Sequence, residues 1–105
     1  MRKKLQKKTS NYKIIVVDDE IGIIETLEVV LRRSGYDVSG ETDPIRAIER
    51  IRQEKFDLLI LDFLMHPLHG DEVVEQIRKF DQEIYILLLT GHRDLAPPLE
   101  TIRAL

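Results

Sequence analysis

Short apolar runs alternate along the chain with longer segments in which apolar residues recur every three or four positions. The runs are almost wholly aliphatic, which is typical of strands that are buried on both faces of a parallel sheet. The longer segments have the periodicity of helices with one apolar face. The pattern predicts apolar strands at 13–17, 58–62 and 84–90, a short polar strand at 36–41, and helices at 21–33, from Pro44, after Gly70 and at 94–105.

The sequence marks the carboxyl end of the first predicted helix more clearly than its buried, apolar face. Apolar residues recur at helical spacing at Ile21, Ile24, Leu31 and either Leu27 or Val29. Arginines occupy the last turn, where cations favour the helix dipole, and the glycine at 35 supplies a stop.

The next two helices carry further signals. Asp43 is expected to cap the second helix, with Pro44 at its first position and a buried stripe of Ile45, Ile48 and Ile51. The apolar face of the third helix is expected to comprise Val73, Val74, Ile77 and Phe80. The strand at 36–41 is short and polar, so we expect it at an edge, whereas the strand at 84–90 is expected to be fully buried.

This order of strands and helices predicts an α/β fold with right-handed crossovers and helices on both faces of a parallel sheet. At 105 residues the chain has room for one core. We expect a basic, flexible leader at 1–12 and one domain at 13–105, with Pro97 and Pro98 near the start of the last helix.

Charge and composition exclude several kinds of site and several classes of protein. The chain lacks cysteine, which excludes disulfides, thiolate zinc sites and cysteine nucleophiles. It shows no secretory signal pattern and no apolar run long enough to span a bilayer, so we expect a cytoplasmic protein. Residues 14–105 carry ten basic and nineteen acidic side chains, which argues against nucleic-acid binding by the domain itself.

Polar side chains follow three of the predicted strands. Asp18 and Asp19 end the first strand, Asp62 ends the third, and Thr90 ends the fourth. In open α/β sheets ligands bind beyond the carboxyl ends of the strands, so we expect these groups to share one pocket. Two carboxylates ~4 Å apart repel by ~4 kcal/mol at an effective dielectric near 20. Oxygen ligands without sulfur or imidazole favour Mg²⁺, or Mn²⁺, over zinc.

Three motifs carry a family resemblance. The segments 16–20, 61–65 with Gly70, and 89–91 resemble the receiver domain of two-component response regulators, including the chemotaxis receiver, over roughly residues 13–105. The resemblance implies a flavodoxin-like, doubly wound parallel sheet with strand order 2-1-3-4, in which the family's usual fifth strand and fifth helix are absent. It also implies a phosphoacceptor switch and not an enzyme.

The resemblance assigns a role to each residue of the pocket. Asp62 is expected to accept a phosphoryl group from a histidine kinase or a phosphotransfer protein. Asp19 would bind Mg²⁺ directly, Asp18 mostly through water, and Leu64 through its backbone carbonyl. Thr90 would hydrogen-bond the phosphoryl group and move inward on phosphorylation.

Two histidines depart from the family pattern. His66 stands four residues after the acceptor, where the family usually has proline, and Pro67 follows it. His92 occupies a position that, in the family, influences the access of water to the phosphoryl group. Both are candidates for tuning the chemistry, although a surface histidine without a role is the simpler interpretation of His66.

The larger departure is at the carboxyl terminus. The family's aromatic switch residue and its lysine are expected beyond residue 105, and Lys79 is the last lysine of the chain. A second interpretation is therefore a truncated or degenerate receiver that works as an interaction module. In that case we expect a homodimer through the edge of the fourth strand or a swapped element, and nucleic-acid contact only through an output domain that is not present here.

The residues at the strand ends also allow two other interpretations. A Mg²⁺-dependent phosphatase or phosphotransferase could use Asp62 as a catalytic nucleophile, but haloacid-dehalogenase-like enzymes have a second aspartate where this chain has Leu64. Asp18 or Asp62 could also merely cap the helix that follows, and Thr90 could simply end a strand.

Overall fold

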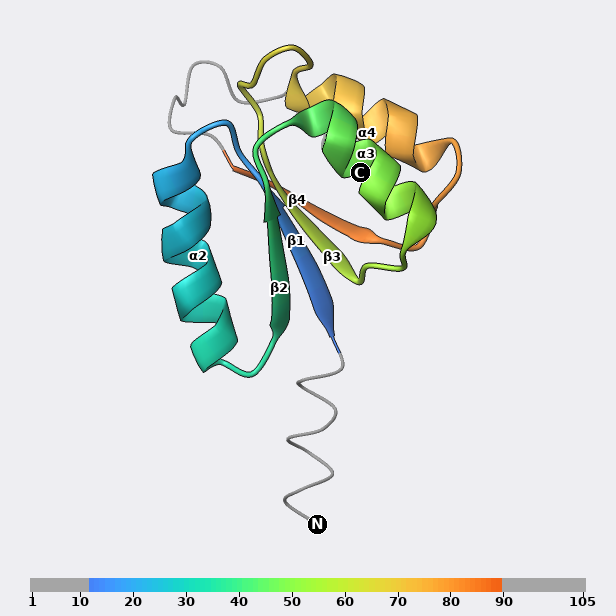
Figure 1. Cartoon of the computed structure of the whole chain (residues 1–105). Helices are drawn as coiled ribbons and strands as arrows, with labels where there is room; N and C mark the ends of the chain where they lie inside the picture. Colours follow the sequence, from blue (N-terminus) through green and yellow to red (C-terminus); the bar gives the residue numbers. More distant parts are fainter. Residues whose placement is uncertain (1–11, 90–105) are drawn as a thin grey trace.

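The described part of the protein forms a four-stranded parallel sheet with helices on both faces (Figure 1). The computed structural model describes residues 12–89. In chain order the elements are β1 (Lys13–Val17), α2 (Ile21–Arg33), β2 (Asp37–Glu41), α3 (Pro44–Gln53), β3 (Leu58–Asp62), α4 (Gly70–Arg78) and β4 (Tyr85–Leu89). The strand order is β2-β1-β3-β4, which confirms the predicted fold class and the edge position of the polar strand.

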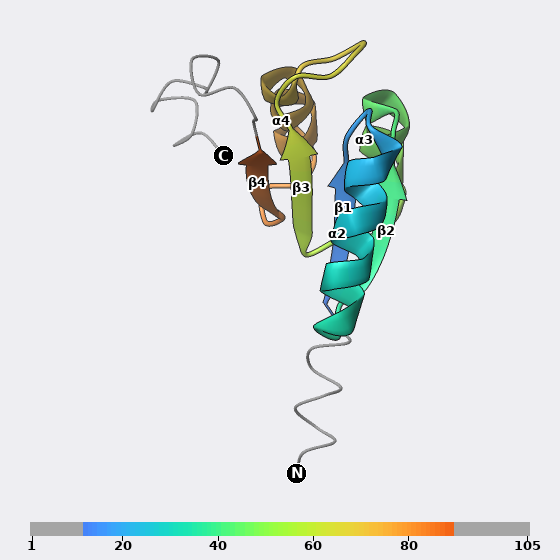
Figure 2. The ribbon, with the colours of Figure 1, turned by 90° about the vertical axis from the view of Figure 1, so that its left-hand side faces the viewer.

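The two faces of the sheet are covered by different helices. Figures 1 and 2 show α2 on one side of the sheet, with α3 and α4 on the other. Alternate residues of β1 enter the two cores: Ile14 and Val16 pack with Ile24 of α2, whereas Ile15 and Val17 join the larger core under α3 and α4. The central strands are therefore buried on both faces, as their unbroken apolar runs predict.

Helix α2 buries less of its apolar surface than the sequence suggests. Ile24 is fully buried and Leu27 and Leu31 pack beside it, so Leu27 and not Val29 belongs to the inner face. Ile21 and Val29 are both more than half exposed. The helix ends at Arg33, and Gly35 adopts a positive φ of 95° that favours glycine.

Helix α3 begins as predicted, and two of the three residues expected in its buried stripe, Ile48 and Ile51, are buried. The Asp43 side chain accepts a hydrogen bond from the N–H of Ile45, and Pro44 occupies the first turn. The buried residues are Pro44, Ala47, Ile48 and Ile51, at the spacing of a single helical face. Ile45 lies about 100° around the helix from Pro44 and is 55% exposed, so its predicted burial is wrong.

The predicted full burial of the fourth strand is also wrong for its described residues. Exposure alternates along β4: Tyr85, Leu87 and Leu89 are exposed, whereas Ile86 and Leu88 pack into the larger core. Parallel pairing of β4 with β3 aligns Ile60 with Leu87, which places Leu87 on the α2 face. Within residues 12–89, α2 does not reach across this face to cover β4.

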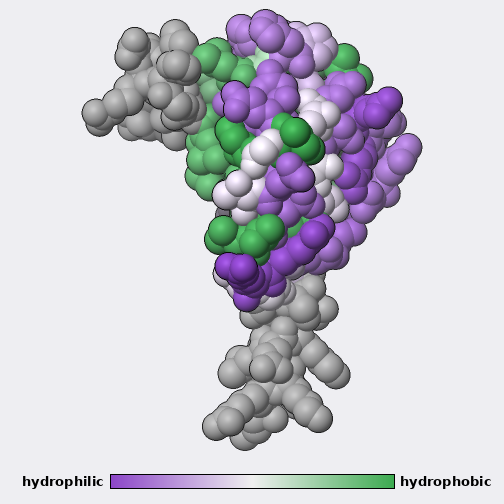
Figure 3. All heavy atoms as spheres, turned by 60° about the vertical axis from the view of Figure 1, so that its left-hand side comes forward, coloured by the Kyte–Doolittle hydropathy of each residue, from purple (hydrophilic) through white to green (hydrophobic). Residues whose placement is uncertain are grey.

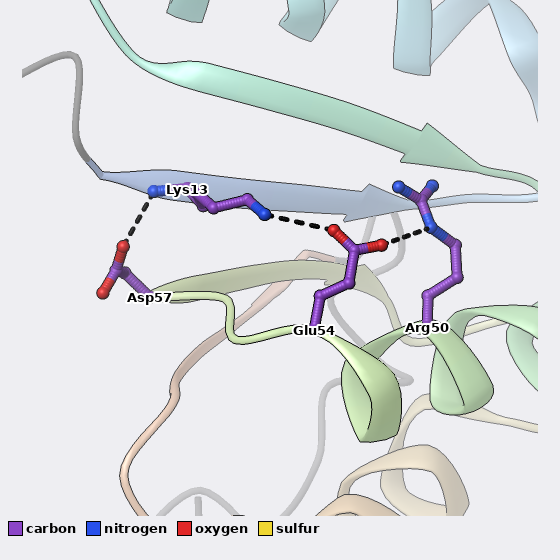
Figure 4. A network of polar contacts seen from close by, with 4 residues as sticks. All are labelled: Lys13, Arg50, Glu54 and Asp57. Carbon is purple, nitrogen blue, oxygen red and sulfur yellow. Dashed lines mark hydrogen bonds and ion pairs between the residues drawn. The ribbon is translucent and has the colours of Figure 1, made fainter.

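A network of hydrogen bonds and ion pairs links the elements at the amino ends of β1 and β3 (Figure 4). The backbone N–H of Lys13 donates to a carboxylate oxygen of Asp57 at 2.8 Å, and the Lys13 ammonium contacts Glu54 at 3.1 Å. Arg50 also approaches Glu54, at 3.7 Å. The hydrogen bond from Lys13 lowers the pKa of the Glu54 carboxyl, with further lowering by the charges of Lys13 and Arg50. The network joins the start of β1 to the end of α3 and the start of β3.

Several predicted features lie outside the described residues. These are residues 1–11 of the leader, the strand end at Thr90 and Gly91, and the helix at 94–105. Phe80 follows the end of α4 but still packs against the larger core. No helix within residues 12–89 is long and apolar enough to cross a membrane.

A glycine in β2 sets how closely α2 approaches the sheet. A Cβ at Gly40 would collide with Cγ2 of Ile24, whereas nothing lies within 4 Å of a Cβ at Gly22. We predict that Gly40→Ala destabilises the fold by about 1–3 kcal/mol through overpacking. Gly22→Ala, a matched change in α2, should stabilise it by up to about 1 kcal/mol. Urea unfolding of both variants checks this, and stabilisation by Gly40→Ala would contradict the packing.

Candidate functional site

Three carboxylates converge where β1 and β3 end. Val17 pairs with Leu61 in the parallel ladder, so the next residues, Asp18 and Asp62, lie at the same level at the carboxyl edge of the sheet. One oxygen from each of Asp18, Asp19 and Asp62 lies within 4.8 Å of the other two. The predicted acidic pocket is therefore formed by the described residues, and we call these three side chains the acidic cluster.

Backbone groups hold two members of the cluster. The N–H of Glu20 donates to Oδ1 of Asp18 at 2.9 Å, and the N–H of Leu64 donates to Oδ1 of Asp62 at 3.4 Å. Neither aspartate is a helix cap, because Glu20 occupies the N-cap position of α2 and His69 that of α4. The capping interpretation of Asp62 is wrong, since α4 begins eight residues later in the chain.

The electrostatics of the cluster are unfavourable for three free charges. Asp18 is 5% exposed, and this burial raises the pKa of its carboxyl. The hydrogen bond from the backbone N–H of Glu20 lowers this pKa, whereas the negative charges of Asp19 and Glu20 raise it further. Burial also raises the pKa of Asp62, and the charge of Asp18 raises it further. A cation among these oxygens would relieve the repulsion.

The donor set fits a hard divalent cation. The described side chains in the cluster offer carboxylate oxygens alone, which are the ligands that Mg²⁺ and Mn²⁺ prefer. The cluster is also open on the side of Asp19, which is exposed, so a bound ion could keep water and meet a ligand from solvent. The assigned roles of Asp18, Asp19, Asp62 and the Leu64 carbonyl remain predictions.

The loop after β3 folds back tightly onto the site. The N–H of Gly70 donates to the carbonyl of Phe63 at 2.8 Å, and Met65 is fully buried below the loop. A Cβ at position 70 would lie 2.9 Å from Cα of Phe63 and 3.1 Å from the carbonyl oxygen of Asp62. Glycine at this position therefore permits the close approach of α4 to the backbone beside Asp62. The sequence motif alone does not reveal this packing role of Gly70.

Of the other residues predicted to act at the site, only His66 lies within the described part of the chain. His66 is exposed on the loop, and its ring lies 6.3 Å from the ring of His69. Thr90 and His92 lie outside the described residues. His69 was not singled out from the sequence, although a histidine directly before Gly70 and two acids is a visible pattern of potential ligands.

Comparison with known proteins identifies the family. A profile described as the response regulator receiver domain matches residues 14–104. A curated relative, the alkaline phosphatase synthesis transcriptional regulatory protein PhoP of Bacillus subtilis, is 44% identical over 81 residues, which cover 77% of this chain and 34% of the relative. The chain thus spans about a third of the length of this relative, and about a fifth of two further regulators that it matches.

Solved structures agree with this result. The response regulator TrrA of Thermotoga maritima, in complex with Mg²⁺-BeF, superposes with a TM-score of 0.81 at 33% identity, covering 89% of this chain and 80% of that one. TrrA in complex with the histidine kinase ThkA gives a TM-score of 0.79 at 32% identity, covering 89% and 79%. The sheet order, the strand-end acids and these matches lead to one conclusion: the chain belongs to the response regulator receiver domain family.

Proposed function

We propose that the domain receives a two-component signal by accepting a phosphoryl group on Asp62 from a histidine kinase or phosphotransfer protein. The observation that carries the proposal is the convergence of Asp18, Asp19 and Asp62 at the ends of adjacent strands. The structure of the similar TrrA with a histidine kinase supports the class of partner, and its Mg²⁺-BeF complex supports the class of cofactor.

The proposed step is a substitution at phosphorus. A carboxylate oxygen of Asp62 forms the new P–O bond while the P–N bond to the donor histidine breaks. The donor ring nitrogen keeps the electron pair of that bond and takes up a proton. The product on this chain is an aspartyl phosphate, so the domain ends the step covalently modified and acts as a switch, not as a turnover enzyme.

The chain's own residues would orient the reacting groups. The Leu64 N–H fixes one oxygen of Asp62, and Asp18 is held by Glu20, so both carboxylates are positioned before a ligand arrives. Asp19, Asp62, the Leu64 carbonyl and, through water, Asp18 would hold Mg²⁺ or Mn²⁺. The bound metal would neutralise charge on the phosphoryl oxygens. Thr90 would donate to a phosphoryl oxygen, and His66 and His92 could tune how long the phosphoryl group persists.

The setting of the domain is also a proposal. We place it in the cytoplasm, in keeping with a cysteine-free, acidic chain of ordinary globular composition. Its excess of acids disfavours direct contact with nucleic acid, so we assign such contact to an output domain outside this sequence. The basic residues 1–12 form a leader in this scheme, and 13–105 form the receiver.

A phosphorylation assay tests the main proposal. The full chain is incubated with acetyl phosphate and Mg²⁺, and its intact mass is measured. We expect one added phosphoryl group on the parent protein and none on Asp62→Asn. Asp43→Asn is the matched control, because asparagine also caps helices, and it should accept the group like the parent. An unmodified parent, or a modified Asp62→Asn, would contradict the assignment.

A second function, self-association, is favoured by the exposed surface of β4. Among residues 12–89 no strand pairs with the outer edge of β4, and Tyr85, Leu87 and Leu89 are 77%, 49% and 38% exposed. A hollow of about 560 Å³, lined by Ile14, Leu31, Tyr36, Tyr85 and neighbours, lies at the amino end of the same face, far from the acidic cluster. Figure 3 shows hydrophobic side chains gathered on this side of the molecule.

We propose that a second copy of the chain covers this surface, by pairing at the β4 edge or by exchange of an element. An unpaired apolar edge is a template for another strand, and two identical edges can be joined by a two-fold axis. The residues of the acidic cluster, Asp18, Asp19 and Asp62, lie outside β4, so association at this surface would not require phosphoryl transfer.

Sedimentation velocity at increasing protein concentration tests this second proposal. We expect the parent to shift toward a dimer. Leu87→Lys should shift the equilibrium back to monomer, because its charge would be desolvated on the face that the second copy covers. Ile45→Lys replaces a residue of α3 that is similarly exposed, and this variant should dimerise like the parent. A parent that sediments as a compact monomer at every concentration would refute the proposed surface.

A further inference from the structure

A second group of potential metal ligands lies where the loop after the acceptor strand meets the start of α4. Ligand atoms of His69, Asp71 and Glu72 all lie within 4.8 Å of one another, and all three side chains are exposed. None of them belongs to the acidic cluster. His69 is the N-cap residue of α4, and the two acids are in its first turn.

The loop holds these groups together in a defined arrangement. The N–H of His69 donates to Oε1 of Glu72 at 3.0 Å, which turns the Glu72 side chain back toward the loop and leaves its second oxygen available. The ring of His66 stands nearly edge-on to that of His69, with 6.3 Å between ring centroids and an angle of 63°. The ring of His69 is also 6.4 Å from the ring of Phe63, measured between centroids. Two imidazoles and two carboxylates therefore occupy one short stretch of chain.

The helix dipole accounts for only half of this group. Acids in the first turn of a helix are favourable wherever they face the N-terminus, so Asp71 and Glu72 need no ligand to explain them. His69 and Glu72 also form a capping box, in which each side chain accepts a hydrogen bond from the backbone N–H of the other residue. Neither the dipole nor the capping box gives a reason for the ring of His66 beside these groups. Mixed nitrogen and oxygen donors at this spacing are the set used by zinc and its transition-metal neighbours.

We propose that His69, Asp71 and Glu72 bind a divalent transition-metal ion of the zinc class, with His66 as a further ligand. Zinc bonds to nitrogen and oxygen are about 2.0–2.2 Å long, so ligand atoms around one tetrahedral ion are about 3.3–3.5 Å apart. Exposed side chains already within 4.8 Å of one another reach that spacing by small rotations. Two imidazoles on one such ion have centroids about 5 Å apart, so His66 has to approach His69 by about 1 Å.

The two proposed metal sites differ in the ion they select. The acidic cluster offers oxygen alone and suits Mg²⁺, whereas the histidine group offers nitrogen and suits zinc. A metal held by His66 and by α4 would close the loop that follows Asp62 into a chelate ring. The inference does not depend on phosphoryl transfer, because the ligands of the histidine group and of the acidic cluster are different residues.

Calorimetric titration of the metal-free full chain with zinc, in saturating Mg²⁺, tests the site. We expect the parent to bind one zinc ion per chain. The zinc affinity of His69→Asn should be at least about tenfold lower, because a residue that binds the metal directly contributes no less affinity than the groups that hydrogen-bond to the ligands. Asparagine is a strong N-cap residue, so this variant keeps the start of α4, and circular dichroism verifies its fold. His66→Ala should also weaken binding, whereas His92→Ala, the third histidine of the chain, should bind like the parent.

Three results would overturn the site. Zinc affinity in His69→Asn equal to that of the parent would exclude the histidine group. Loss of zinc binding in Asp19→Asn with normal binding in His69→Asn would assign the ion to the acidic cluster. No zinc binding by the parent would refute the proposal outright.

Discussion

Repulsion among carboxylates that the sheet cannot separate is the constraint on which the site depends. The parallel register of β1 and β3 brings Asp18 level with Asp62, and Asp19 completes a group whose oxygens lie within 4.8 Å. Both strands are buried on two faces, so neither can shift without disrupting two cores. The molecule can relieve this repulsion by protonation or by a bound cation. Burial raises the pKa values of Asp18 and Asp62, and the neighbouring carboxylate charges raise them further.

Much of this arrangement can be predicted from the sequence. Unbroken apolar runs at β1 and β3 indicate central parallel strands, and an acid directly after each run places a carboxylate at the carboxyl edge of the sheet. Asp43 and Pro44 mark the start of α3 by side-chain and backbone chemistry that acts locally. These features depend on neighbours in the chain, so the sequence pattern reveals them.

Other features depend on partners that are remote in the sequence. Every described residue of β4 is apolar, so no alternation indicates that Tyr85, Leu87 and Leu89 lie on a face that α2 leaves open. Ile45 fits a helical spacing with Ile48 but lies outside the face that the core selects. The close approach of Gly70 to the Asp62 backbone, and the gathering of His69 with Glu72, arise from how the loop folds back after β3.

The most direct test of the central account is fluorine NMR of the protein with beryllofluoride, a phosphoryl mimic, in the presence and absence of Mg²⁺. If the acidic cluster holds the metal beside the acceptor, bound-fluoride resonances should appear only with Mg²⁺, and they should be lost in Asp62→Asn. Bound resonances that persist without Mg²⁺ or without the Asp62 carboxylate, or a parent protein that shows none, would contradict the account.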